Sequence, residues 1–190
     1  MIDLSKTPPG QLPPDFVTAR TGGGAPAAWS VADDATAAGG RVIVQTSSDQ
    51  TDYRFPLAIY EKLPAANVDV TVRFKAIAGR VDRAAGIAIR LADPDNYYVV
   101  RANALEDNVN FYRVIKGSRR EIKGVSTKVT PDIWHTLGLK AEADTFSISF
   151  DGKVLFTTTD RTFTGAGKVA LWTKADSVTR FDTLSIKTLP

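Results

Sequence analysis

Two short polar segments of the chain, DQTDYR from residue 49 and TKADS from residue 173, combine carboxylates with cations beside apolar stretches. A carboxylate can take a proton from carbon, and an ammonium or guanidinium group can stabilise charge that develops on a carbonyl oxygen. A base and an electrophile together can therefore remove a proton beside a carbonyl group and drive an elimination. The candidate bases are Asp49, Asp52 and Asp176, and the candidate electrophiles are Lys174 and Arg54.

A structural interpretation of the same segments stays open. Asp49 and Asp52 can cap a turn through Asx hydrogen bonds, which is a common use of aspartate in loops. We therefore take Asp52, Asp176 and Lys174 as the candidate catalytic set, with turn capping as the alternative.

A second group of residues points to ligand binding. The stretch IAIRLADPDNYYVVRANALEDNVNFYRVIKG, residues 87 to 117, reads as consecutive strands joined by Asp/Asn-rich turns. Side chains two residues apart on a strand share a face, so aliphatic residues form one face and polar or aromatic residues the other. An aromatic ring can stack on the apolar face of a sugar while Asn and Arg side chains meet its hydroxyl groups. The candidate saccharide-binding residues are Arg54, Arg90, Arg101, Asn103, Asn110, Tyr112 and Trp172.

This assignment of faces has two alternatives. Trp172 and Tyr112 can instead close the edge of the sheet, with the arginines solvated. One β-bulge between residues 109 and 116 would also exchange the two faces of that strand.

Metal and cofactor chemistry has little support in the composition. The chain has no cysteine and one histidine, His135, which excludes a thiolate site and a multi-histidine site. We interpret His135 as structural. Hard oxygen donors of the kind that calcium prefers are present, without EF-hand spacing. They are Asp93, Asp95, Asn96 and Asp182, of which Asp182 is the candidate ligand of a structural calcium ion; no other cofactor is indicated.

The elements that must position these residues are strands. Val68, Val70, Val72 and Phe74 alternate with polar residues, and an Asp-Gly pair at 151–152 separates two apolar stretches, which is typical of a two-residue hairpin turn. No stretch has a helical period. About a dozen short strands in one chain favour an all-β fold of two stacked antiparallel sheets, a sandwich or jelly roll.

Length and composition favour one domain over residues 15–190, after a Pro-rich lead-in at 1–14. The net charge of +3 is spread along the chain, so a nucleic-acid partner is not implied. No apolar run approaches the roughly 20 residues that span a bilayer, so membrane insertion is not expected either. The oligomeric state stays open.

Four short motifs resemble the concanavalin A-like lectin/glucanase superfamily, and in particular the bacterial 3-keto-disaccharide hydrolase domain. They are NYYVVRANALEDNVNFYRVIKG from residue 96, IWHTL from 133, FSISFDGK from 146, and GKVALW from 167 with FD at 181–182. The resemblance extends over roughly residues 15–187. It implies a jelly roll of two curved antiparallel sheets, with any ligand on the concave face or its rim, a calcium ion on the convex side of many members, and a periplasmic or extracellular location. No leader peptide is expected in residues 1–16, which contain no charged segment followed by an apolar one, and a cytoplasmic location stays open.

The resemblance implies fold more strongly than activity. Glucanases of this superfamily carry their carboxylates in one Glu-x-Asp-x-x-Glu strand, and none of the four glutamates here stands in such a run. The expected function is saccharide binding, and the resemblance implies action on a keto-disaccharide as the candidate activity. A keto group on a sugar acidifies the neighbouring C–H bond, so one base and one electrophile are enough to open its glycosidic bond by elimination. The alternative is a non-catalytic binding or structural module of a secreted or cell-surface assembly. An enzyme should have a deep pocket and a binding module a shallow aromatic platform, whereas a fold without a ligand should have a concave face filled by its own side chains.

Overall fold

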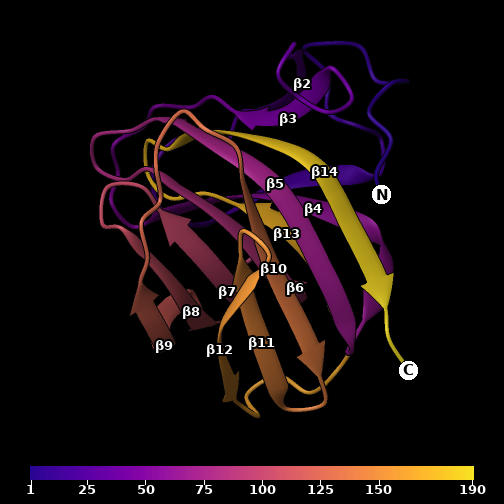
Figure 1. The fold of residues 1–190 in the computed structure, drawn as a ribbon, viewed down its shortest axis with the longest axis vertical. Coiled ribbons are helices and arrows are strands. Elements are labelled where there is room, and N and C mark those ends of the chain that lie inside the picture. The colour runs from indigo at the N-terminus through magenta and orange to yellow at the C-terminus, as the bar shows by residue number, and fades with distance from the viewer.

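The computed structural model describes residues 1–190 and consists of fourteen β-strands joined by turns and loops (Figure 1). The strands form two antiparallel sheets of seven strands each, which confirms the predicted all-β jelly roll. The first sheet has the order β1 (Phe16–Gly22), β4 (Arg54–Ala65), β13 (Gly167–Trp172), β6 (Ala84–Asp93), β7 (Asn96–Asn103), β8 (Asn108–Ile115) and β9 (Ser118–Ser126). The second sheet has the order β12 (Lys153–Thr159), β11 (Thr145–Phe150), β10 (His135–Glu142), β5 (Val68–Ala78), β14 (Val178–Thr188), β3 (Arg41–Gln45) and β2 (Trp29–Asp33).

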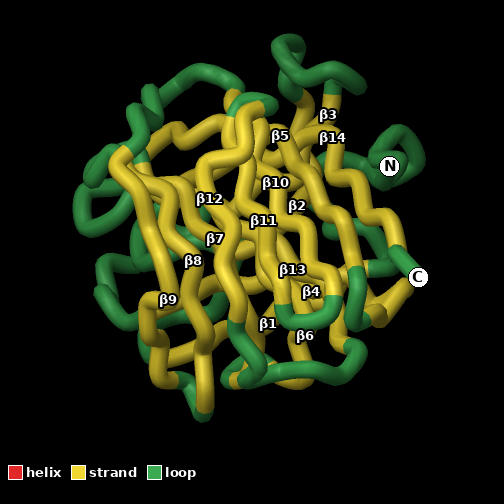
Figure 2. Tube along the Cα trace, turned by 60° about the horizontal axis from the view of Figure 1, so that its bottom comes forward, coloured by secondary structure: helices red, strands yellow, loops and turns green.

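Both chain termini lie on the same side of the sandwich, and strands make up most of the trace (Figure 2). The structure has no helix of the length and apolarity needed to cross a membrane.

The main hydrophobic core fills the space between the two sheets. It contains 31 buried residues, and the alternating set Val68, Val70, Val72 and Phe74 of β5 belongs to it, as the sequence pattern predicts. Tyr98 of the first sheet packs on Phe146 of the second, with ring centres 4.7 Å apart. The two-residue period of the strands therefore assigns one face of each sheet to this core.

A second cluster of twelve buried hydrophobic residues lies on the opposite face of the first sheet. This face is concave, because elements at opposite edges of the sheet meet across it. The Tyr53 hydroxyl, just before β4, donates to Gly117 O at 2.8 Å and accepts a bond from the Arg119 amide at 2.6 Å. Thr21 of β1 shares a 2.8 Å hydrogen bond with the Tyr97 hydroxyl of β7. The curled sheet thus encloses a small core of its own.

The predicted hairpin turn at 151–152 is present between β11 and β12. Asp151 has a φ of 48° and Gly152 a φ of 78°. Positive φ at both central residues is the geometry of a type I′ turn, which an Asp-Gly pair adopts readily. The Asp151 carboxylate accepts bonds from His135 Nδ1 at 2.7 Å and the Thr136 amide at 2.8 Å, while His135 Nε2 lies 3.1 Å from Thr130 O. His135 therefore joins the turn to β10, in agreement with the structural role expected for it.

Candidate functional site

Five charged side chains meet at one end of the concave face, and we call them the rim cluster. Arg101 extends from β7, Asp82 lies in the loop before β6, and Lys174 follows β13. Lys174 Nζ is 3.0 Å from Asp82 Oδ2 and 2.5 Å from Asp52 Oδ1. Arg101 Nη2 is 2.7 Å from Glu106 Oε2, and Arg101 Nη1 is 3.9 Å from Asp82 Oδ2. The members of the rim cluster are Asp52, Asp82, Arg101, Glu106 and Lys174.

The rim cluster has a buried layer and an exposed layer. Asp82 is 1% exposed and the Arg101 and Lys174 side chains are 2% and 10% exposed, whereas the side chains of Asp52 and Glu106 are 72% and 50% exposed. Two buried cations thus hold two solvent-facing carboxylates, with a buried carboxylate beneath them. Such a layered arrangement fixes the exposed oxygen atoms in place.

Burial and charge pairing shift the pKa values of these groups in different directions. Burial raises the pKa of Asp82 despite the attraction of Lys174 and Arg101. Burial opposes protonation of Lys174, but its hydrogen bond to Asp52 and the charge of Asp82 outweigh burial and raise its pKa. The pKa of Glu106 is lowered, because hydrogen bonds from Asn108 and the charge of Arg101 outweigh its burial.

Asparagine side chains add hydrogen bonds to the rim cluster and to the concave face beside it. Asn103 Nδ2 donates to Asp82 Oδ1 at 2.9 Å, and its Oδ1 accepts from the Leu105 amide at 2.9 Å. Asn108 Oδ1 accepts from Arg101 at 2.8 Å. The amide of Asn110 donates to the Tyr112 hydroxyl at 3.1 Å. Arg101, Asn103, Asn110 and Tyr112 therefore share the concave face, as the alternation of the sequence predicts.

Trp172 and Tyr112 do not form the exposed stacking platform expected from the sequence. Trp172 is fully buried and donates from Nε1 to the Tyr97 hydroxyl at 3.2 Å. The Arg119 guanidinium lies over both rings, at 4.5 Å from the centre of Tyr112 and 5.8 Å from that of Trp172. The middle of the concave face is therefore filled by the protein's own side chains, which is the arrangement expected of a fold without a ligand at that position, and only its rim is open to one.

Two of the predicted site residues support the rim cluster from behind. The Asp176 carboxylate accepts bonds from the backbone amides of Arg80, Val81 and Asp82 at 2.8, 3.0 and 3.0 Å. Burial opposes ionisation of Asp176, but these amide bonds lower its pKa. Asp176 thus anchors the loop that carries Asp82, and its oxygens point at amides rather than at solvent.

Arg54 is the second supporting residue, and it is fully buried. Its guanidinium donates to three backbone carbonyls, those of Ala25 at 2.9 Å, Pro26 at 3.0 Å and Ala175 at 2.7 Å, and to the Ser47 hydroxyl at 2.9 Å. It therefore joins the loop after β1 to the turn that contains Lys174, and its donors are taken up by the protein.

Arg90 lies away from the other predicted binding residues. Its φ of 48° and a register shift between Ile89 and Asp93 break the alternation of β6. The side chain instead donates to Ala66 O at 2.8 Å and Phe163 O at 2.7 Å, and lies 5.2 Å from the ring centre of Phe146 in the second sheet. A β-bulge thus moves Arg90 off the concave face.

The oxygen donors considered for calcium do not converge. Asp182 lies in β14 of the second sheet, and its Oδ2 accepts bonds from the Ala38 amide and from Arg73, both at 2.8 Å. Asp93 and Asn96 bond to each other at the turn between β6 and β7 in the first sheet. No three His, Cys, Asp or Glu side chains are grouped so that they could hold a metal ion. Asp182 therefore does not share a position with the Asp93–Asn96 pair, and a structural calcium ion at Asp182 stays a prediction.

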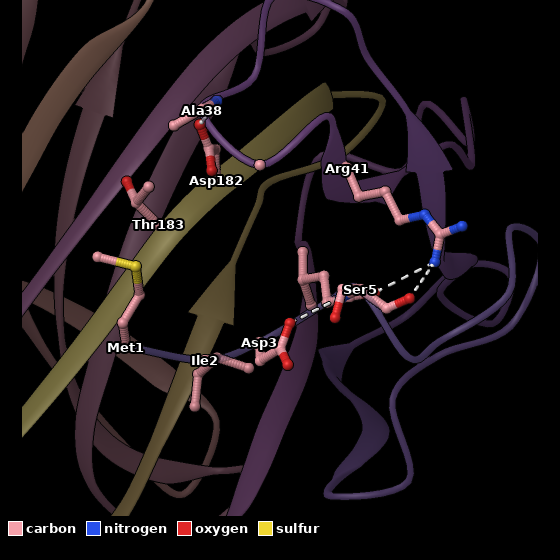
Figure 3. Close-up of a pocket in the computed structure, with 10 residues that line it drawn as sticks. Met1, Ile2, Asp3, Ser5, Ala38, Arg41, Asp182 and Thr183 are labelled. Atoms are coloured by element: carbon pink, nitrogen blue, oxygen red, sulfur yellow. Dashed lines mark hydrogen bonds between the residues drawn. The ribbon is translucent and has the colours of Figure 1, made fainter.

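The largest cavity, about 490 Å³, lies between the N-terminal segment and β14 (Figure 3). Asp182 and Arg41 line it, and Arg41 Nη1 donates to Ser5 O at 2.7 Å. None of the five cavities of the molecule includes a rim-cluster residue. The rim cluster is therefore an open surface and not a deep pocket.

Sequence reasoning did not identify Asp82, Glu106 or Arg119 as site residues. Asp82 lies in a loop without any period, and nothing in the sequence links it to the distant Lys174. Glu106 had a usable signal, since the β7–β8 turn brings it back to Arg101 only five residues away. Arg119 lies just after the Lys116–Gly117 turn, among other basic residues. Such a basic stretch is equally typical of a solvated edge strand, so the sequence does not single out Arg119.

Comparisons with known proteins agree with the fold. The family model described as "Galactocerebrosidase, C-terminal lectin domain" matches residues 63–189. The carbohydrate binding module CBM66 from Bacillus subtilis has a similar structure, with a TM-score of 0.71 and 18% identity over 90% of this chain and 95% of that chain. No curated protein sequence matches the chain.

Two further solved structures share the fold. A protein of unknown function with a galectin-like fold from Bacillus subtilis has a TM-score of 0.61 and 11% identity over 90% of this chain and 89% of that chain. The GH16 protein of the Bacteroides ovatus mixed linkage glucan PUL, solved in complex with a product, has a TM-score of 0.57 and 11% identity over 85% of each chain. The concanavalin A-like jelly roll expected from the sequence is thus confirmed, and it is shared by a binding module, a protein with a galectin-like fold and a GH16 protein.

Proposed function

The chain belongs to the family of the C-terminal lectin domain of galactocerebrosidase, and we propose that it is a carbohydrate-binding module whose saccharide site is the rim cluster. The matched residues 63–189 include Asp82, Arg101, Glu106 and Lys174. The carbohydrate binding module CBM66, whose fold this chain shares, adds support for the ligand class.

The observation that carries the proposal is the pair of exposed carboxylates held by buried cations. Sugar hydroxyl groups donate well to carboxylates and accept from ammonium and amide groups. Lys174 holds Asp52 at 2.5 Å and Arg101 holds Glu106 at 2.7 Å. Because both carboxylates are oriented before a ligand arrives, little side-chain entropy is lost on binding. The rim cluster is therefore prepared for a polar ligand with several hydroxyl groups.

The shape of the site favours binding over catalysis. Pockets that enclose a whole small ligand usually measure about 300–1,000 Å³, and none of the cavities of this protein lies at the rim cluster. A site without walls does not exclude water, so it gives little of the electrostatic advantage on which catalysis depends. We expect the rim cluster to bind one end or one edge of the saccharide, while the rest of the ligand stays in solvent.

The contact between Asp52 and Lys174 supports a second candidate function. A carboxylate and an ammonium group 2.5 Å apart are a base and an electrophile within reach of one sugar ring. This pair is the one expected for cleavage of a 3-keto disaccharide. Asp52 alone would be its base, since the oxygens of Asp176 are bonded to amides.

A binding experiment with matched variants tests the module. Glu106→Gln removes a rim carboxylate charge that is half exposed, and Glu142→Gln removes one of similar exposure, 57%, from the second sheet. We expect a glycan array to identify neutral saccharide ligands, and calorimetry to show at least tenfold weaker binding to Glu106→Gln with no change for Glu142→Gln. Equal affinities of the two variants, or an array without ligands, would refute the proposal.

A separate assay decides the enzymatic candidate. The protein is incubated with a 3-keto disaccharide and its unoxidised parent, and monosaccharide release is followed by NMR. Release from the keto sugar alone, abolished in Asp52→Asn, would establish cleavage. Binding without release would leave the module as the function.

A further inference from the structure

The hairpin of β8 and β9 carries an unusual concentration of positive charge. Residues 113 to 123, RVIKGSRREIK, include five basic residues and one acidic residue, more positive charge than the net charge of the whole chain. The turn residues Lys116 and Gly117 both have positive φ, 49° and 76°, and the Tyr53 hydroxyl bonds to Gly117 O in the turn and to the Arg119 amide just after it. The charges are therefore presented on a fixed element.

Two arginines of this hairpin face each other directly. Arg113 pairs with Arg120 in the ladder, and Ile115 pairs with Ser118. These four side chains project from one face of the hairpin and line a cavity of about 160 Å³. That face is opposite to the one that carries Tyr112, so the cavity is separate from the rim cluster.

Like charges directly opposite each other destabilise an antiparallel pair. Arg113 is partly relieved by Asp160, whose Oδ2 lies 2.6 Å from its Nη1, but its Nε is buried without a hydrogen-bond acceptor. Arg120 is exposed and pairs with no carboxylate. The cavity is thus left with an excess of guanidinium donors and a hydroxyl donor from Ser118.

We propose that Arg113 and Arg120 form a binding site for a sulfate or phosphate monoester group. Guanidinium groups bind tetrahedral oxyanions through paired N–H donors, and two such groups on one face can surround a single anion. The anion would also remove the repulsion between the two arginines. Ser118 adds a donor and Ile115 an apolar wall.

The size of the cavity restricts what can enter it. About 160 Å³ is well below the roughly 300–1,000 Å³ of pockets that enclose a whole ligand. The cavity is suited to one anionic substituent, while the molecule that carries it stays on the surface. The site does not depend on the proposed saccharide site, because the two lie on opposite faces of β8.

NMR titration of the whole protein tests the site, with galactose 6-sulfate, galactose and inorganic sulfate as probes. The arginine Nε–Hε signals report directly on the two side chains. We expect galactose 6-sulfate to shift the signals of Arg113 and Arg120 saturably, and galactose to leave them unchanged. Arg120→Ser should weaken binding of galactose 6-sulfate at least tenfold. The matched control Lys187→Ser removes one exposed positive charge from β14 and should have no effect.

The probes separate the possible sources of the anion. Tighter binding of galactose 6-sulfate than of inorganic sulfate supports a sulfated saccharide as the ligand, and equal binding supports a free oxyanion. Unmoved arginine signals would overturn the proposal. Equal weakening by Arg120→Ser and Lys187→Ser would do so as well, because it would show that only the overall charge matters. Galactose shifting the same signals would also count against an anion site.

Discussion

The guanidinium of Arg119 lies 4.5 Å from the ring centre of Tyr112 and covers it. The same group lies 4.8 Å from the ring centre of Phe55, across the concave face in β4. One cation thus occupies the place over the aromatic floor where a sugar ring would stack in an open concave face. The hydrogen bonds of Tyr53 to the hairpin keep Arg119 in this position.

Replacing Arg119 by alanine should destabilise the protein and expose the rings of Phe55, Tyr112 and Trp172 that its guanidinium covers. A partly desolvated cation–π contact contributes about 0.5–2 kcal/mol, and Arg119 has three, so we expect a loss of about 1–3 kcal/mol in the free energy of unfolding. Urea denaturation measures this loss.

Quenching of Trp172 fluorescence by acrylamide gives an independent readout. In a background where Trp29 and Trp134 are replaced by phenylalanine, Trp172 should be quenched more strongly after Arg119→Ala. The control Arg161→Ala removes an arginine that is 82% exposed and should change neither property. Unchanged quenching with Arg119→Ala would show that other side chains cover Trp172.

The Asp176 carboxylate is expected to be structural and to act on the rim cluster indirectly. Asp176→Ala leaves three backbone amides without their acceptor, and each unsatisfied buried group costs about 1–3 kcal/mol. We expect a large fall in stability together with loss of saccharide affinity, since the loop also carries Asp82. Asp176→Asn keeps one acceptor oxygen and should recover part of both. Asp95→Asn, at an exposed turn, serves as control. Normal stability of Asp176→Ala would contradict the anchoring role.

How far the sequence predicts this site depends on how regular each element is. β7 is an uninterrupted strand, so the alternation places Arg101 and Asn103 correctly on the concave face. In β6 a bulge with positive φ at Arg90 ends the alternation, and no residue in that strand signals it. The covering of Trp172 by Arg119 depends on how strongly the sheet curls, which is a property of all seven strands together. The faces of regular strands are therefore predictable, whereas contacts across the curl are not.

The charges of the second sheet predict how stability depends on pH. Burial opposes ionisation of Asp34, but hydrogen bonds from Thr36 and Arg180 outweigh it and hold its pKa well below the usual range. A carboxylate with a lowered pKa in the folded state stabilises the fold above its unfolded pKa of about 4, and this contribution is lost as the pH falls below that value.

Asp34→Asn should therefore lower stability near pH 7 and flatten the loss of stability between about pH 4 and pH 2. Urea unfolding at several pH values measures how steeply the free energy of unfolding falls as the pH is lowered. Asp33→Asn removes the neighbouring carboxylate, which is 72% exposed, and serves as control. If the free energy of unfolding fell as steeply with falling pH in Asp34→Asn as in the unmodified protein, the lowered pKa assigned to Asp34 would be contradicted.

The pair of Lys174 and Asp82 gives the sharpest test of the rim cluster. Removing one partner of a buried ion pair leaves an uncompensated charge and typically costs about 3–5 kcal/mol. Lys174→Met should be strongly destabilised, because Asp82 then keeps only Arg101 at 3.9 Å as a cationic partner.

The double variant Lys174→Met/Asp82→Asn should regain much of this stability, since no unpaired carboxylate remains in the buried layer. A double-mutant cycle from urea denaturation isolates the coupling of the pair, for which we expect more than about 1 kcal/mol. Saccharide affinity should not recover with stability, because the cation that holds Asp52 is absent. Additive effects of the two substitutions would show that the pair does not act as a unit. Recovery of affinity in the double variant would exclude Lys174 from the binding site.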